Sequence, residues 1–547
     1  MKKRMNKYKA MKKNNFVQGA FIATLGIVIS KLMGILYVIP FYSIVGEKGG
    51  ALYGYGYTIY LVFMAISSAG IPLAISKIIS EYQTLGYYNA KKRAFYLGKK
   101  MALMLGVISF IILFIFAPFF SKLILGDLKG GNSLSDVTHV IRCISTAILV
   151  VPLLSIYRGY FEGHKYITPA SISQVLEQIV RVTIIILGSF LTLKIFKLSL
   201  KDTVGLAVFG ATLGSLIAYF YLFGVRFKNK KRFNTKILNV KEPRIADKEI
   251  CKKILIYAFP LVMIDIFKSL YSVIDAFTVV KSLGPIYGVK DAELIMSILS
   301  TWGAKFNMIV IAISTGVVVS LIPNLTSAYV LNNMDDVRKK INQCFQILVF
   351  LILPLTVGLS FLAKPIYTLF YGESIYGPSI FTIYIFVAFF TSLYTVAVTI
   401  CQVLKYYKIV YISLISGILL KILINVSLMS ELYSLGLPAY YGPIIATILA
   451  YILSFIICLI AINVNCKINY ERTISLSINM LCGTIIMTIS LLILKLLIPS
   501  YSEVRLINLF IIIIYSIVGS LIYIFYMYKT KTIKEIYGNK LLKKNLQ

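Results

Sequence analysis

Fourteen apolar runs, each long enough to cross a lipid bilayer, constrain this chain more than any other feature. A transmembrane helix needs ~20 consecutive and mostly apolar residues. The pattern therefore predicts an all-α polytopic membrane protein with about 14 transmembrane helices. The predicted spans are residues 16–44, 57–80, 97–120, 138–160, 168–193, 203–225, 254–280, 302–328, 343–363, 376–402, 410–430, 441–465, 473–498 and 505–528.

The distribution of basic residues predicts the orientation of these spans. The chain carries a formal net charge of +35, although 59% of its 547 residues are hydrophobic. Cytoplasmic loops of membrane proteins are enriched in Lys and Arg. With the amino terminus inside, the predicted cytoplasmic segments hold roughly 35 of these residues and the outer segments roughly 9. We therefore expect a multi-pass protein of the cell membrane with both termini in the cytoplasm. No polar segment is long enough for a nucleic-acid-binding domain.

The spans repeat after roughly 240 residues, which indicates two related units. Residues 65–70 resemble residues 312–316, and the fifth and eleventh spans both carry a charge near their centres. Because six spans separate the units, both would insert in one orientation around a central cavity. The predicted parts are a basic tail, an N-lobe of helices 1–6, a basic loop, a C-lobe of helices 7–12, helices 13–14 and a second basic tail, at residues 1–15, 16–225, 226–253, 254–465, 466–528 and 529–547.

Several basic side chains lie at membrane depth, where a charge is costly and usually faces a cavity or a partner. Lys31 and Lys421 have no acidic neighbour on their own helices, and a central Lys cannot easily reach the membrane surface. We therefore expect both to line a water-filled cavity. With Lys268 they would make it cationic, so it would attract phosphate and repel drug cations. Arg181 and Lys305, the latter near the outer end of the eighth span, complete the predicted binding residues.

Acidic residues share two of these spans. Glu177 and Arg181 stand four residues apart and can pair within one helix, as can Asp265 and Lys268 at three residues apart. Asp265, Lys268 and Asp275 fall on one stripe of the seventh span. We predict that Asp265, Asp275 and Glu177 take part in ion coupling or gating.

The sequence has no pattern that is typical of an enzyme or of a bound cofactor. It lacks the phosphate-binding loop of ATPases. Its two histidines and seven cysteines show no metal-ligand spacing. The predicted outer loops are short, and their few acidic residues form no cluster, which disfavours a membrane enzyme. We therefore expect a transporter without catalytic residues, metal or cofactor, driven by a sodium or proton gradient or by the membrane potential.

Five stretches of the sequence match the pattern of a known transporter family. Two of them contain R-G-x-F-x-G and S-Q-x-x-E-Q, and the five are Tyr157–Lys165, Thr168–Gln178, Ser67–Pro72, Lys421–Asn425 and Gly442–Thr447. The chain thereby resembles the stage V sporulation protein B/YtgP branch of the MOP exporter superfamily, in which MurJ-type lipid II flippases and MATE transporters are its neighbours.

The resemblance implies two six-helix lobes packed as a V, two further C-terminal helices, and export of undecaprenyl-pyrophosphate-linked glycans by alternating access. It places Lys31 where the family has an Arg in an S-R-x-x-G pattern, whereas Tyr37 replaces a second Arg. We predict a monomeric flippase for lipid II or a related wall precursor, with Lys31, Lys268 and Lys421 holding the pyrophosphate. The alternatives are a MATE-type drug or cation antiporter and an exporter of another polysaccharide precursor.

Overall fold

The computed structural model describes most of the chain. The described residues are 26, 29–31, 33–68, 70–126, 131–230, 233, 242–331 and 333–537, without the side chains of 319–324, 326–327 and 330. The predicted tail 1–15, most of the first half of the first span and the last ten residues of the second tail lie outside this part of the chain.

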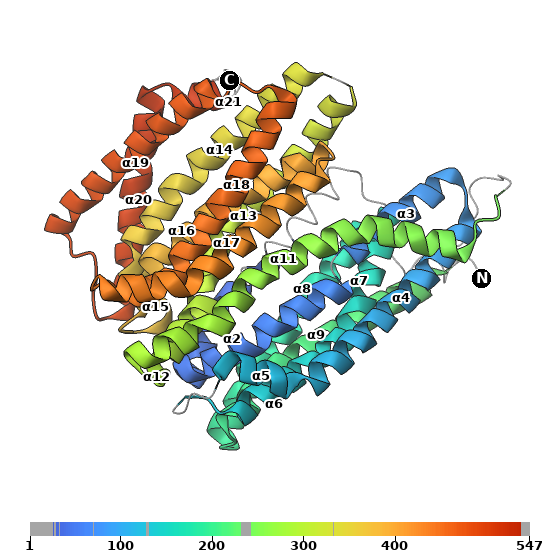
Figure 1. Ribbon diagram of the computed structural model, residues 1–547, viewed down its shortest axis with the longest axis horizontal. Coiled ribbons are helices and arrows are strands. Elements are labelled where there is room, and N and C mark those ends of the chain that lie inside the picture. Colours follow the sequence, from blue (N-terminus) through green and yellow to red (C-terminus); the bar gives the residue numbers. More distant parts are fainter. Residues whose placement is uncertain are drawn as a thin grey trace, which may run out of the picture. The chain divides into compact units, whose positions relative to one another are not determined.

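The described residues form helices and no strand, and the chain divides into two compact units. The first unit is Met1–Val273 and the second is Ile274–Gln547. Helices of the first unit (Figure 1) are α2 (Val38–Ser68), α3 (Ile71–Leu85), α4 (Tyr88–Ile115), α5 (Ala117–Leu125), α6 (Leu134–Ser145), α7 (Ala147–Gly163), α8 (Ile167–Thr183), η2 (Ile184–Gly188), η3 (Leu191–Ile195) and α9 (Leu200–Lys228). Helix α11 (Asp247–Tyr287) contributes to both units.

The second unit continues from the end of α11. Its helices are α12 (Val289–Ser297), η4 (Ile298–Trp302), α13 (Gly303–Val330), α14 (Met334–Phe361), α15 (Ala363–Tyr371), α16 (Gly377–Val403), α17 (Tyr407–Ser434), η5 (Ala439–Tyr441), α18 (Gly442–Cys466), α19 (Glu471–Leu497), α20 (Arg505–Lys529) and α21 (Thr532–Tyr537).

Twelve helical stretches of the described residues are long and apolar enough to cross a membrane. They overlap the predicted spans two to six and eight to fourteen, and confirm the all-α membrane fold. The predicted first span lies partly outside the described residues. The predicted seventh span, 254–280, lies within α11, which is not among the twelve. The count of fourteen is therefore not confirmed.

Two glycines break the helices at the start of the first unit. Gly46 and Gly70 have φ angles of 65° and 71°, a region that glycine occupies without steric cost. The predicted loop at 45–56 is consequently reduced to a kink at Gly46, and the predicted second span is broken at Gly70. A Cβ on Gly70 would also lie 2.7 Å from the carbonyl oxygen of Ala258, so this break allows α11 to approach closely.

The same helix pairs pack together in each unit. In the first unit, α3 packs on α4 and α7, α7 packs on α9, and α8 packs on α9. In the second, α13 packs on α14 and α16, α16 packs on α18, and α17 packs on α18. Short α5 and α15 follow α4 and α14 in equivalent places. The pairings recur at the offset that the sequence repeat predicts.

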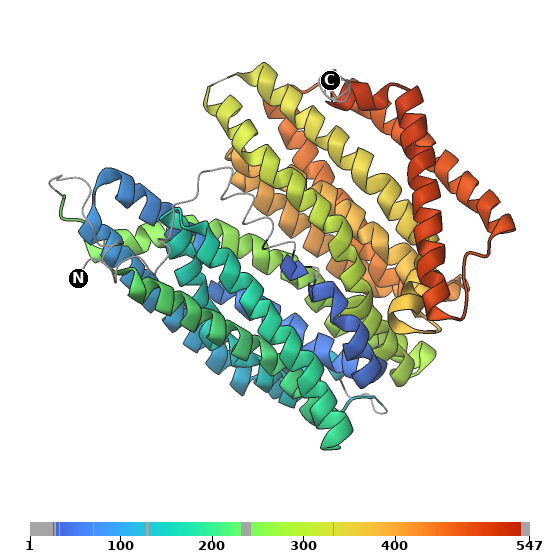
Figure 2. The ribbon, with the colours of Figure 1, turned by 180° about the vertical axis from the view of Figure 1, so that it is seen from behind.

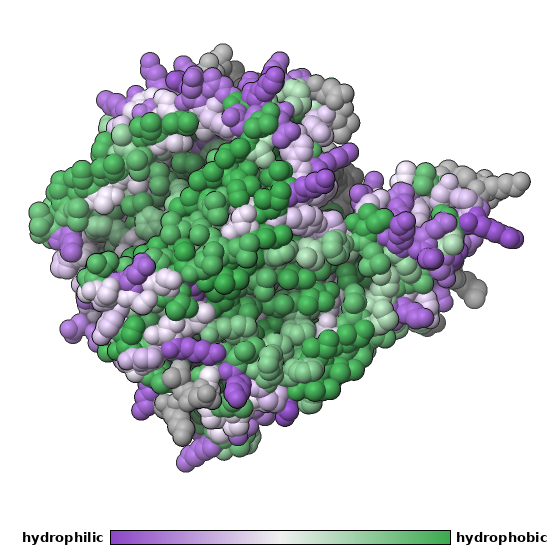
Figure 3. All heavy atoms as spheres, viewed as in Figure 1, coloured by the Kyte–Doolittle hydropathy of each residue, from purple (hydrophilic) through white to green (hydrophobic). Residues whose placement is uncertain are grey.

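The two C-terminal spans belong to the second unit. Helices α19 and α20 pack on each other and on α14, and α20 also contacts α15 (Figure 2). They expose many large apolar side chains, such as Leu492, Phe510 and Phe525. In this unit hydrophobic residues cover the middles of the helices, and hydrophilic residues gather near the end of the bundle where α21 lies (Figure 3). An apolar belt of this kind suits contact with lipid tails.

Two glycines of the R-G-x-F-x-G motif let α7 pack tightly on α3. A Cβ on Gly159 would overlap the carbonyl oxygen of Pro72, and one on Gly163 would lie 2.6 Å from that of Ser76. Small residues allow such close backbone approach between membrane helices. The motif glycines therefore serve packing.

Replacing Gly159 with alanine is expected to destabilise the protein by about 1–3 kcal/mol, because the new methyl group meets backbone and not a flexible side chain. Gly224 is the matched control, since nothing lies within 4 Å of a Cβ there. Gly224→Ala should be neutral or stabilising, because alanine favours the helix. Thermal unfolding of both variants in detergent measures the difference, and equal effects would contradict this account of the motif.

Candidate functional site

A buried charged cluster in the first unit consists of Arg158 on α7 with Ser173, Glu177 and Arg181 on α8. The Arg158 Nη2 donates to Glu177 Oε2 at 2.8 Å, and the Arg181 Nη2 donates to Glu177 Oε1 at 2.6 Å. The Nε of Arg158 donates to the Ser173 hydroxyl at 2.9 Å. We call these four residues the Arg158–Glu177 cluster.

This cluster explains the charged residues of both sequence motifs. Arg158 comes from R-G-x-F-x-G, and Ser173 and Glu177 come from S-Q-x-x-E-Q, so the two motifs bind each other across α7 and α8. The three charged side chains are only 12–20% exposed. Two guanidinium groups share one carboxylate, which leaves a formal excess of one positive charge. Among the described residues, Arg181 Nε has no hydrogen-bond partner.

The intrahelical pair predicted between Glu177 and Arg181 is present. The second partner of Glu177 is Arg158, which belongs to the R-G-x-F-x-G motif and is not among the predicted site residues. Arg158 lies 19 positions before Glu177 on another helix, so helical periodicity does not relate the two. In the sequence, the one indication that Arg158 and Glu177 act together is that each lies in a motif of the same family.

A second buried cluster lies in the second unit, where Lys421 on α17 meets Asp275 on α11. The Lys421 Nζ donates to Asp275 Oδ2 at 2.7 Å and to the Thr447 hydroxyl of α18 at 2.5 Å. The Asn425 Nδ2 donates to Thr278 Oγ1 at 2.8 Å and to Asp275 Oδ1 at 3.3 Å. We call these five residues the Asp275–Lys421 cluster.

The surroundings of Lys421 differ from the predicted water-filled cavity. Its side chain has 0% exposure and its charge is balanced by Asp275. The partner lies 146 residues earlier in the chain, so inspecting the Lys421 helix alone could not reveal it. A buried charge is tolerated when it is paired and hydrogen-bonded, and both conditions hold here. The role of Lys421 in binding a substrate stays a prediction.

The remaining predicted site residues occupy three settings. Lys31 is half-buried, and no carboxylate pairs with it among the described residues. Asp265 and Lys268 are both exposed on α11, and the described part of the chain contains no ion pair between them. Lys305 is half-buried in the first turn of α13. Because α12, η4 and α13 run without a break from Val289 to Val330, Lys305 lies inside a long helix and not near its end as predicted.

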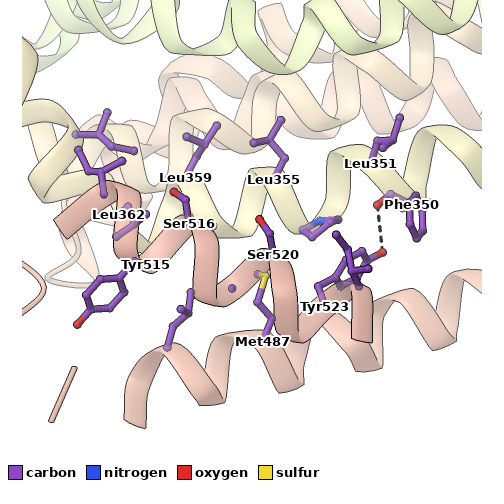
Figure 4. Close-up of a pocket in the computed structure, with 17 residues that line it drawn as sticks. Phe350, Leu351, Leu355, Leu359, Leu362, Met487, Tyr515, Ser516, Ser520 and Tyr523 are labelled. Carbon is purple, nitrogen blue, oxygen red and sulfur yellow. Dashed lines mark hydrogen bonds between the residues drawn. The ribbon is translucent and has the colours of Figure 1, made fainter. Parts of the chain in front are cut away.

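An apolar cavity of about 290 Å³ lies between α14, α19 and α20 of the second unit (Figure 4). Leucines of α14 line one wall, and α20 faces them with Tyr515, Ser516, Ser520 and Tyr523. The Tyr523 hydroxyl donates to the carbonyl oxygen of Phe350 at 3.1 Å. The lining is suited to a hydrocarbon chain and offers no charged side chain.

Known sequences resemble this chain over nearly its whole length. Residues 16–327 match the model of a family described as polysaccharide biosynthesis protein. The lipid II flippase MurJ of Bacillus subtilis (strain 168) is 33% identical over 537 residues, which cover 96% of this chain and 98% of that relative. Stage V sporulation protein B of the same organism is 26% identical over 221 residues, which cover 40% of each chain.

Solved structures with the same fold are transporters. The inward closed conformation of lipid II flippase MurJ aligns with a TM-score of 0.65 and 16% identity, over 93% of this chain and 99% of that one. An inward-facing multidrug resistance MATE transporter of the MOP superfamily aligns with a TM-score of 0.62, over 82% and 99%. The first of these relatives is a lipid II flippase, and the two solved structures are a lipid II flippase and a multidrug transporter. This chain is therefore a multi-pass membrane protein that belongs to the polysaccharide biosynthesis protein family, within the MOP exporter superfamily of flippases and transporters.

Proposed function

We propose that this protein moves an undecaprenyl-pyrophosphate-linked cell-wall precursor, lipid II, to the outer leaflet of the cytoplasmic membrane by alternating access. The observation that carries this proposal is the 33% identity to a lipid II flippase over 96% of the chain. We propose further that the protein acts as a monomer and that both termini lie in the cytoplasm, as the asymmetry of basic residues favours.

Cationic side chains at membrane depth support a pyrophosphate substrate. The half-buried Lys31 has no carboxylate partner among the described residues, and the Arg158–Glu177 cluster carries one more positive than negative charge. Lys268 and Lys305 are further cations that would attract the phosphates. A drug or cation antiporter would instead need an excess of acidic groups. The ammonium group of Lys421 is already paired with Asp275. We therefore propose that Lys421 acts by holding the Asp275 carboxylate and does not hold the pyrophosphate directly.

Binding of the polyprenyl tail needs an apolar surface. The cavity between α14, α19 and α20 has hydrocarbon walls and lies among spans that expose large apolar side chains. We propose that part of the tail rests here while the head group crosses.

A source of energy must drive the change between inward and outward states. The sequence has no ATP-binding loop, so we propose a sodium or proton gradient or the membrane potential. Asp275 is the favoured coupling residue, because a cation bound there would compete with Lys421 for the carboxylate. Glu177 and Asp265 are further candidates for coupling or gating.

Reconstitution of the full chain in proteoliposomes tests the proposed substrate. Fluorescent lipid II should become accessible to an external quencher, whereas an undecaprenyl monophosphate sugar should not, because it lacks the second phosphate. Flipping of neither lipid, together with uptake of a cationic drug, would overturn the proposal and favour the antiporter. Equal flipping of pyrophosphate-linked glycans without the peptide would point to another polysaccharide precursor.

Replacing Lys31 with alanine is expected to abolish lipid II flipping, because the ammonium group would no longer meet the pyrophosphate. Lys48→Ala is the control, since Lys48 is an exposed lysine on the next helix. Both variants should reach wild-type levels in the membrane. If Lys31→Ala flips lipid II at the wild-type rate, Lys31 is not part of the binding site.

A further inference from the structure

A small cavity of about 140 Å³ lies at the carboxyl-terminal end of α9, where this candidate membrane span ends. It is smaller than the ~300–1,000 Å³ of sites for drug-sized ligands, so it suits one small polar group. Two basic and four aromatic side chains line it: Tyr160, Phe223, Arg226, Phe227, Lys230 and Phe233.

Aromatic rings, not a carboxylate, hold the guanidinium of Arg226. Its central carbon lies 4.4 Å from the ring centroid of Phe95, 5.2 Å from that of Tyr160 and 5.9 Å from that of Tyr157. Such stacking fixes a cation in place without neutralising its charge. Among the described residues, neither Arg226 nor Lys230 forms an ion pair.

The neighbouring sequence provides no anion for these two cations. Residues 226–241 contain seven Lys and Arg and no Asp or Glu. The first acidic residue after them, Glu242, accepts hydrogen bonds from the backbone N–H groups of Asn89 and Ala90 at 3.0 and 2.5 Å. The carboxylate of Glu242 is therefore engaged at the start of α4.

The position of the cavity indicates where an anion would come from. Phe223 and Phe227, one helical turn apart, are 43% and 71% exposed on a candidate membrane span. Exposed Phe rings on a span suit contact with lipid acyl chains, and basic pockets between spans bind anionic lipid head groups.

We propose that this cavity binds the phosphate of an anionic phospholipid such as phosphatidylglycerol. Arg226 and Lys230 contact the phosphate, and Phe223 and Phe227 contact the acyl chains. The site is separate from the proposed transport of lipid II and does not depend on it.

Native mass spectrometry of the purified full-length protein, titrated with defined lipids, tests the proposal. Phosphatidylglycerol should bind more tightly than zwitterionic phosphatidylcholine. The double variant Arg226→Gln/Lys230→Gln should weaken phosphatidylglycerol binding about 30-fold, the effect of two basic residues at a membrane surface. The control is Lys529→Gln/Lys531→Gln, which removes two exposed lysines at the end of α20, beside Phe525. It should bind as the wild type does.

Two further measurements separate the outcomes. The single variant Lys230→Gln changes an exposed side chain, so it should weaken binding without unfolding the protein. Soluble glycerol 3-phosphate should compete poorly, because it lacks acyl chains. Wild-type binding by the double variant, or equal binding of phosphatidylcholine, would overturn the site. Binding of glycerol 3-phosphate as tight as that of the lipid would assign the site to a soluble phosphate instead.

Discussion

Replacing Asp275 with leucine is expected to lower the stability of the second unit by about 3–5 kcal/mol, because it leaves the ammonium group of Lys421 buried without the carboxylate that balances its charge. The Thr447 hydroxyl would still accept a hydrogen bond from Lys421, but it carries no charge that balances the ammonium group. The single tryptophan of the chain, Trp302, is fully buried in the same unit, so its fluorescence reports thermal unfolding of this unit directly.

A double variant separates the cost of an unpaired charge from the value of the pair. Asp275→Leu/Lys421→Met removes both charges and should recover most of the lost stability, since apolar replacements of buried ion pairs are often neutral. Lys408→Met, at an exposed lysine in the first turn of α17, is the control and should change little. If the double variant is stable but does not flip lipid II, the pair serves transport. Additive losses in the double variant would contradict the ion-pair account.

Glu177→Gln is expected to destabilise the first unit by about 3–5 kcal/mol, whereas Arg158→Gln should cost less. The reason is the charge of the cluster. Removing Glu177 leaves the guanidinium groups of Arg158 and Arg181 without their shared carboxylate, while removing Arg158 leaves the neutral Glu177–Arg181 pair. Unfolding temperatures of both variants in detergent measure this order.

The same two variants connect the cluster to transport. If the extra positive charge attracts the pyrophosphate, Arg158→Gln should reduce lipid II flipping more than its small loss of stability explains. Ser173→Ala is the matched control, because it removes one hydrogen bond to Arg158 and leaves the charges unchanged. Equal destabilisation by Glu177→Gln and Arg158→Gln would show that the excess charge does not decide the stability of the cluster.

Local patterns predicted most of the helices. The length of an apolar run predicted a span at 410–430, and the structure has α17 at Tyr407–Ser434. The agreement arises because the thickness of the bilayer fixes the length of a span. The apolar pattern predicted the wrong helix limits where the conformation of the backbone determines them. At Gly46 a sharp kink replaces a predicted loop of twelve residues. In the Val289–Val330 helix, the charged residues Lys290, Asp291 and Glu293 hide the fact that the helix begins before the predicted span.

Side-chain partners were predictable only along one helix. The spacing of four residues predicted the pair of Glu177 and Arg181, which is present. A spacing of three residues also allows an ion pair between Asp265 and Lys268. Both side chains are instead exposed. Spacing shows that two side chains can meet, while the competition with solvent and with other helices decides whether they do.

The sequence by itself determined that this protein is a helical multi-pass membrane protein with a twofold internal repeat, because span length and motif residues are properties of short stretches. Only the tertiary structure decided which charges are neutralised. Lys421 was expected to be a free cation and is a buried partner of Asp275 from a helix 146 residues away. Arg158 joins Glu177 across two helices. Whether a charge is paired depends on groups brought close by packing, and no local pattern of the chain records that distance.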